Sequence, residues 1–171
     1  MASSAFAPTE EGEARLLLLI NAFSKGGGHL QGRVKLAKLD FLLRYPRFFE
    51  RAMAARDRVV AVEDEPEPAI EQRMVRYRYG PWDPSYYGLL GRLIGKGLVV
   101  PVPQARYIGF RVTEAGHEVA NAIAEDDAWS RTARSARNLK TEFPTQTGTW
   151  LKDFIYRTFP EVAGADWGRV L

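Results

Sequence analysis

Residues 91–97 (GRLIGKG) come closest to a phosphate-binding loop in this sequence. Such a loop has the pattern G-x-x-x-x-G-K-[ST], with a hydroxyl residue directly after the lysine. Here three residues separate Gly91 from Gly95, and Gly97 follows Lys96. The segment also closes a predicted helix, whereas a phosphate loop opens one. We therefore interpret it as a helix stop, the position that glycine favours.

The other residues that could do chemistry lack the partners that catalysis needs. The chain has two histidines, His29 and His117, and no cysteine, so it matches no zinc-ligand pattern and can form no disulfide. No serine lies in the context of a nucleophile elbow. The acidic residues at 64–67 and 125–127 are typical of solvated charge rather than of an acid/base pair. We expect a protein that is not an enzyme and has no cofactor and no metal.

The charge is unevenly distributed along the chain. The net charge is +3, and 18 of the 24 basic residues are arginine. Residues 63–71 (EDEPEPAIE) carry five acids and no base, whereas residues 73–111 carry seven bases and one acid, Asp83. Such a basic block attracts phosphate groups or an acidic partner protein equally well.

Residues 73–98 (RMVRYRYGPWDPSYYGLLGRLIGKGL) combine arginines with aromatic rings. Three interpretations stay open: a protein interface, contact with a nucleic-acid backbone, or a core with a solvated face. A base-reading helix displays more polar side chains than this segment offers. The candidates for contact with a partner or a nucleic acid are basic and aromatic residues: Arg73, Arg76, Arg78, Trp82, Tyr86, Tyr87, Arg92, Lys96 and Arg106.

The first half of the chain is predicted to be helical. Thr9 is a suitable N-cap, and the glycines at 26–28 end the first helix. A second helix is expected over 32–45, and a third begins at Pro46 and runs to about residue 58. The third helix should bury Phe49, Ala52 and Met53. Residues 1–8 read as a disordered tail, and the acidic, proline-containing residues 63–68 read as an exposed connection.

The second half is predicted to contain a strand, a hairpin and four helices. Residues 74–79 alternate as in a short strand, followed by a turn and a helix to about Lys96, with Leu90, Ile94 and one of Tyr86 and Tyr87 on one side. Residues 98–102 and 107–112 have the spacing of a hairpin. Thr113 caps the next helix, which carries Val119 and Ile123. Two amphipathic helices should follow, from about residues 127 and 149.

This order of elements predicts the fold class. A helix, a hairpin and a returning helix after earlier helices are typical of a winged helix-turn-helix domain. We expect a mainly α protein with a small β-hairpin wing. Its winged helix-turn-helix core should span residues 9–125, with a C-terminal helical extension over 126–171.

Three segments also resemble a known family. They are 35–46 (KLAKLDFLLRYP), 76–99 (RYRYGPWDPSYYGLLGRLIGKGLV) and 109–116 (GFRVTEAG). Together they resemble the middle component of bacterial ABC-three-component systems, operons related to Lamassu anti-phage defence, with RYGPWDPSYY as the distinctive part. The resemblance implies a small non-catalytic subunit that works with an SMC- or Rad50-like ABC ATPase and an effector protein. It implies no catalytic residue.

The functional expectation is therefore an accessory subunit whose aromatic and arginine-rich segment contacts the ATPase, the effector or DNA. The alternative is a winged-helix transcription regulator that binds duplex DNA. The absence of cysteine, of a signal peptide and of a long apolar run favours a cytoplasmic protein that does not enter a membrane.

Overall fold

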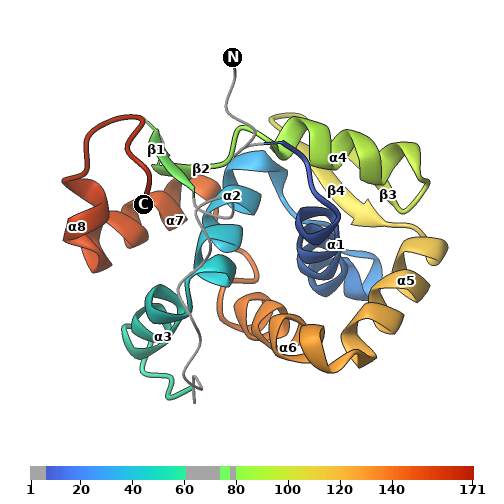
Figure 1. The fold of residues 1–171 in the computed structure, drawn as a ribbon, viewed down its shortest axis with the longest axis horizontal. Coiled ribbons are helices and arrows are strands. Elements are labelled where there is room, and N and C mark those ends of the chain that lie inside the picture. The colour runs from blue at the N-terminus through green and yellow to red at the C-terminus, as the bar shows by residue number, and fades with distance from the viewer. Residues whose placement is uncertain (1–6, 61–73, 78–79) are drawn as a thin grey trace.

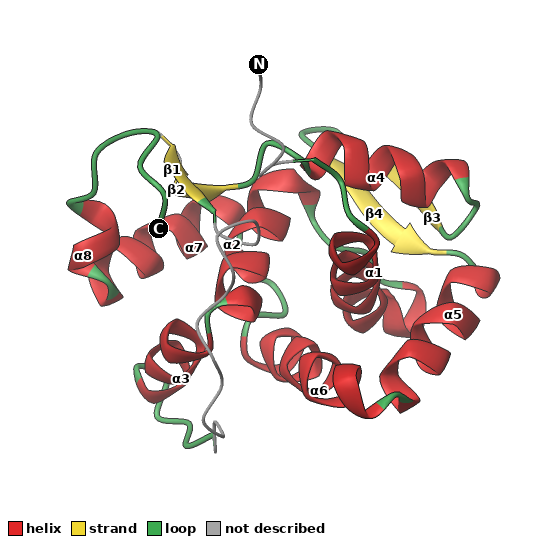
Figure 2. Cartoon of the chain, viewed as in Figure 1, coloured by secondary structure: helices red, strands yellow, loops and turns green. Residues whose placement is uncertain are grey.

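A computed structural model describes residues 7–60, 74–77 and 80–171 of the chain. This part is mainly helical, with two short antiparallel hairpins (Figure 2). The helices are α1 (Glu10–Ser24), α2 (Gly32–Arg44), α3 (Pro46–Ala54), α4 (Tyr86–Gly95), α5 (Glu114–Glu125), α6 (Asp127–Glu142), α7 (Gly148–Thr158) and α8 (Pro160–Ala163). The strands are β1 (Val75–Tyr77), β2 (Gly80–Trp82), β3 (Val99–Pro103) and β4 (Ile108–Val112). No described helix is both long enough and apolar enough to cross a membrane.

Local signals explain most helix boundaries. The hydroxyl groups of Thr9 and Thr113 accept hydrogen bonds from the first turns of α1 and α5, as the sequence predicts. After α1, Gly26 and Gly27 have φ values of 67° and 79°, a conformation that glycine adopts without strain. Gly97, with φ of 72°, ends α4 in the same way. The interpretation of residues 91–97 as a helix stop is confirmed.

The core forms around α1 and α2. The apolar side chains from Leu16 to Ile20 in α1 are at most 3% exposed, because α4, α5, α6 and β4 surround this helix. Helix α2 packs chiefly against α7, β2 and α3. The residues of α6 and α7 that face inward belong to the same buried cluster as those of α1 and α2. The C-terminal helices therefore complete the core of residues 9–125.

The two hairpins lie at opposite ends of the molecule (Figure 1). The β3–β4 hairpin lies beside α4, and its register pairs Val99 with Val112. Leu30 forms a further antiparallel bridge to Phe110, so the segment between α1 and α2 extends this sheet. The β1–β2 hairpin lies near α7, α8 and the C-terminal residue. The β3–β4 hairpin is the one that the sequence predicts.

Several details differ from the sequence-based expectations. Helix α3 ends at Ala54, short of residue 58, and β2 occupies positions where only a turn was expected. Helix α4 begins at Tyr86, because the carboxylate of Asp83 accepts a hydrogen bond from the Ser85 amide and holds the preceding residues in a turn. Residues 63–68, expected to form an exposed connection, lie outside the described residues.

Two apolar residues that the sequence patterns single out, Ile94 beside Leu90 in α4 and Val119 with Ile123 in α5, lie at the surface. Ile94 is 37% exposed and Val119 is 39% exposed. The inward positions of these helices are taken by Leu93 and Ala120, each one residue away along the helix. A shift of one residue turns a helical side chain by about 100°, which is enough to move it from the core to solvent.

Candidate binding surface

A buried charge network joins α1, α2 and α4. Asp40 is fully enclosed and accepts hydrogen bonds from Arg15 Nε at 2.7 Å and Arg44 Nε at 2.8 Å. The hydroxyl of Tyr86 donates a third hydrogen bond to Asp40 at 2.7 Å. Arg44 also reaches Asp83, with 2.5 Å between Nη2 and Oδ2. Two carboxylates and two guanidinium groups therefore balance each other beneath the surface.

The network fixes the protonation state of its members. Burial alone would raise the pKa of Asp40, but the guanidinium groups of Arg15 and Arg44 lower that pKa to about 2. Burial and the charge of Asp40 raise the pKa of Tyr86 well above its ordinary value, so its hydroxyl remains a donor. Removal of one partner from a buried, hydrogen-bonded ion pair strongly lowers the free energy of unfolding, because the other charge is left buried without a partner.

Lys38 forms a second buried link, which joins α2 to β2. Its ammonium group donates a hydrogen bond to the Pro81 carbonyl at 3.1 Å, and the residue is 1% exposed. Burial, together with the charge of Lys152, lowers the pKa of Lys38 to about 7. Gly80 has φ of 98°, and a Cβ atom there would lie 2.9 Å from Lys38 Cε. Glycine at position 80 therefore leaves the space that the lysine stem occupies.

These two links join the segments 35–46 and 76–99, which both carry the family resemblance described above. Lys38, Asp40 and Arg44 come from the first segment, and each of them pairs with a residue of the second. The expectation that Tyr86 contacts a partner is wrong, because its side chain is fully buried against Asp40. Its role in the folded chain is to hold α4 on α2.

The side chain of the next residue, Tyr87, points about 100° away around the helix and is 62% exposed. The guanidinium carbon of Arg33 lies 4.5 Å from the centre of the Tyr87 ring. Trp82, which is half-buried, lies 5.1 Å from Tyr86 and 6.4 Å from Tyr87 between ring centres. We call the three residues Trp82, Tyr87 and Arg33 the aromatic patch. Tyr86, which is hydrogen-bonded to Asp40 in the buried network, packs against Trp82 and so supports the buried side of the patch.

The remaining predicted contact residues do not join this patch. Arg92 donates to the Pro8 carbonyl at 3.1 Å, and Lys96 pairs with Glu13 at 3.0 Å, so both side chains face the start of α1. Arg106 is exposed in the turn between β3 and β4. Arg73, Arg78 and the side chain of Arg76 lie outside the described residues.

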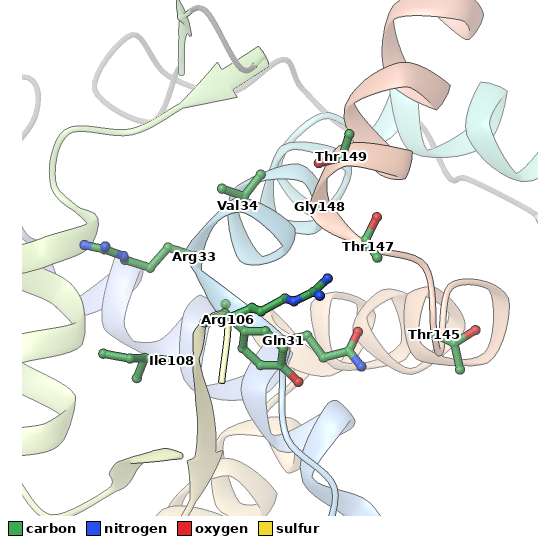
Figure 3. Close-up of a pocket in the computed structure, with 11 residues that line it drawn as sticks. Gln31, Arg33, Val34, Arg106, Ile108, Thr145, Thr147, Gly148 and Thr149 are labelled. Atoms are coloured by element: carbon green, nitrogen blue, oxygen red, sulfur yellow. The ribbon is translucent and has the colours of Figure 1, made fainter. Parts of the chain in front are cut away.

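Arg106 belongs instead to a groove with a volume of about 650 Å³. Residues 31–34 at the start of α2, 106–108 of the hairpin, and 145 with 147–149 at the start of α7 line it. In Figure 3 the Arg106 side chain extends over the groove toward Thr147, whereas Arg33 points away from it. We call this feature the threonine groove, after Thr145, Thr147 and Thr149.

Sequence reasoning missed Arg33 and the residues of the threonine groove other than Arg106. Arg33 was assigned to no function, since its contact with Tyr87 joins positions far apart in the chain. The run TQTGT at 145–149 is the signal that could have marked the groove, because Thr and Gly cluster there before an amphipathic helix. Within the described residues, no group of three His, Cys, Asp or Glu side chains is placed to hold a metal ion.

Comparison with known proteins adds no relative to this geometry: no protein-family model, no curated protein sequence and no solved structure matches the chain.

Proposed function

We propose that this chain is a non-catalytic accessory subunit of a bacterial anti-phage defence complex. It bridges an SMC- or Rad50-like ABC ATPase and an effector protein, and it acts in the cytoplasm. The observation that carries the proposal is the aromatic patch. An exposed tyrosine stacked with an arginine, beside a half-buried tryptophan, has the composition of an energetic centre in protein interfaces.

The aromatic patch lies on a part of the molecule that the buried network around Asp40 holds in place, and this favours a docking role for the patch. The hydrogen bond from Tyr86 to Asp40 holds the backbone of α4 next to Tyr87, and the contacts with Arg33 and Trp82 restrict the exposed ring itself. A side chain that is already ordered loses less conformational entropy when a partner binds it. The resemblance of residues 76–99 to the middle component of ABC-three-component systems supplies the identity of the proposed partners.

The core is proposed to be a winged helix-turn-helix domain. The order α1, Leu30 bridge, α2, α4 and β3–β4 hairpin supports this proposal, although α3 and the β1–β2 hairpin are inserted between α2 and α4. This order also favours the second candidate function, a transcription regulator that binds duplex DNA. The exposed positions of α4 weigh against base reading, because only Tyr87 and Arg92 among them can form hydrogen bonds. The others, Gly91, Ile94 and Gly95, offer no hydrogen-bonding side chain.

Co-purification tests the proposed function. The tagged chain is expressed with the products of its adjacent genes, and the retained proteins are identified by mass spectrometry. We expect an ABC ATPase and an effector to be retained by the natural chain. Tyr87→Ala should lose at least one of them, because the substitution removes the exposed ring and leaves Tyr86 in place.

Val119→Ala is the matched control, since Val119 is an exposed apolar residue on α5, outside the patch. It should retain both partners. Absence of an ATPase and an effector from the natural complex would refute the proposal. Specific binding to the promoter of its own gene that survives a salt series would favour the regulator instead.

A further inference from the structure

The threonine groove carries positive charge without compensation. Arg106 extends over the groove, the side chain of Arg33 at its edge points away toward Tyr87, and none of the lining residues, all of which the structure describes, is acidic. The other polar side chains that line it are neutral: the hydroxyls of three threonines and Tyr107, and the amide of Gln31. A groove of this composition attracts anions and offers them hydrogen-bond donors.

Two helix N-termini meet at this groove. Helices α2 and α7 both begin among its lining residues, and neither of these described helices has an acidic side chain in its first turn. Thr147 caps α7 by accepting a hydrogen bond from the Trp150 amide. The partial positive charges of both helix dipoles therefore add to the field of Arg106.

The walls of the groove are held at a fixed separation. A Cβ atom at Gly148 would lie 2.6 Å from Val34 Cγ1 and 2.9 Å from the Lys35 amide nitrogen, so α7 begins in direct contact with α2. The ammonium group of Lys35 donates to Gln31 Oε1 at 3.2 Å and to the Pro144 carbonyl at 3.1 Å. This lysine ties the start of α2 to the loop before α7.

We propose that the threonine groove binds the phosphate backbone of duplex DNA, with Arg106 as the principal contact. Arginine, threonine, glutamine and tyrosine side chains together with helix N-termini are the groups that proteins use to contact phosphates and sugars. Binding of single strands relies instead on free aromatic faces for the bases. The one ring that lines the groove is Tyr107, and its hydroxyl is 2.9 Å from His29 Nε2.

This inference goes beyond the proposed bridging function, because the groove and the aromatic patch use different side chains. Arg106 extends over the groove, whereas Arg33 turns toward α4 and stacks on Tyr87 (Figure 3). DNA contact through the groove is independent of base sequence, since the lining groups reach phosphates. The partner proteins and DNA can therefore be tested separately.

Fluorescence anisotropy with a labelled duplex of mixed sequence tests the inference. The full chain is titrated over a series of salt concentrations. The natural chain should bind with an affinity that falls steeply with salt. Arg106→Ala should reduce the slope of log K against log salt by about 1, the effect of one phosphate contact. Arg106→Glu should weaken binding by about tenfold or more at low salt.

Arg134→Glu is the control for net charge, because Arg134 is exposed on α6 and does not line the groove. It should bind the duplex nearly as the natural chain does. Thermal unfolding followed by circular dichroism checks that each variant is folded. Thr149→Glu, which places a carboxylate in the groove without removing an arginine, should also weaken binding.

Four outcomes would overturn the inference. They are equal losses for the Arg106→Glu and Arg134→Glu variants, tighter binding of a single strand than of the duplex, displacement of the duplex by ATP at equal phosphate concentration, and binding of polyglutamate in place of DNA. The last would identify the groove as a site for an acidic protein. Retention of ATPase and effector by the Arg106→Glu variant would show that the bridging function is separate from the groove.

Discussion

The hydroxyl of Tyr86 donates a hydrogen bond to Asp40 at 2.7 Å, and both side chains are fully enclosed. The two residues lie 46 positions apart and belong to different helices. A buried carboxylate is stable only when it is paired and hydrogen-bonded, and this one has two arginines and a tyrosine. One small group of charges therefore ties the start of α4 to α2, while the rest of the helix packs against α1 and β3.

Asp40→Asn should lower the free energy of unfolding by about 3–5 kcal/mol, because it leaves buried guanidinium groups without their counter-charge. Tyr86→Phe removes one hydrogen bond and should cost about 1 kcal/mol. Urea denaturation followed by tryptophan fluorescence measures both. Equal losses for the two variants would show that the charge of Asp40 contributes little.

The carboxylate of Asp40 also predicts how the stability of the folded chain changes in acid. The pKa of Asp40 is lowered from 3.8 to about 2 in the folded chain, so the unfolded chain binds its proton first as pH falls. Stability from this group is complete above pH 3.8 and is lost as pH falls toward about 2. The Asp40→Asn variant lacks this titration. Its melting temperature should change less than that of the natural chain over this interval.

Lys38 predicts a change in the same direction at higher pH. Its pKa falls from 10.5 to about 7 on folding, so the unfolded chain binds more protons between these values. Stability from this group should therefore rise with pH over that interval. Lys38→Met should flatten the rise in the free energy of unfolding, measured by urea titration at several pH values. Lys25→Met, at an exposed residue, is the control and should leave the rise unchanged.

Substitution of two glycines by alanine should change the free energy of unfolding in opposite directions. Gly80→Ala should destabilise by about 1–3 kcal/mol, because the residue has φ of 98° and Lys38 fills the space beside it. Gly91 lies within α4, and a Cβ atom there would meet nothing within 4 Å. Gly91→Ala should stabilise by about 1 kcal/mol through helix propensity. Thermal unfolding compares the two, and a stabilising Gly80→Ala would contradict the packing described here.

Sequence patterns predict the local elements well because their causes are local. Thr9 and Thr113 cap helices through groups within the next turn, and Gly97 ends α4 through its own conformation. The spacing of two β-prone runs was sufficient to predict the β3–β4 hairpin. These signals require no knowledge of what lies on the other side of the core.

Buried charge was not predictable in the same way. Lysine is rarely enclosed in a protein, yet Lys35 and Lys38 are both buried because α7 and β2 cover their side of α2. Asp83 is the single acid in a basic block, which in hindsight marked it as the partner of an arginine. Tyr86 and Tyr87 cannot be assigned to core and surface until the start of α4 is known, and the turn at Asp83 sets that start.

The start of α5 packs tightly against Gly97 and Leu98, the residues that follow α4. A Cβ atom at Gly116 would lie 1.9 Å from the Leu98 carbonyl oxygen, and the Thr113 hydroxyl donates to the Gly97 carbonyl at 2.6 Å. The base of the hairpin is therefore anchored to the first turn of α5, so the hairpin that carries Arg106 is expected to move together with α5 rather than on its own.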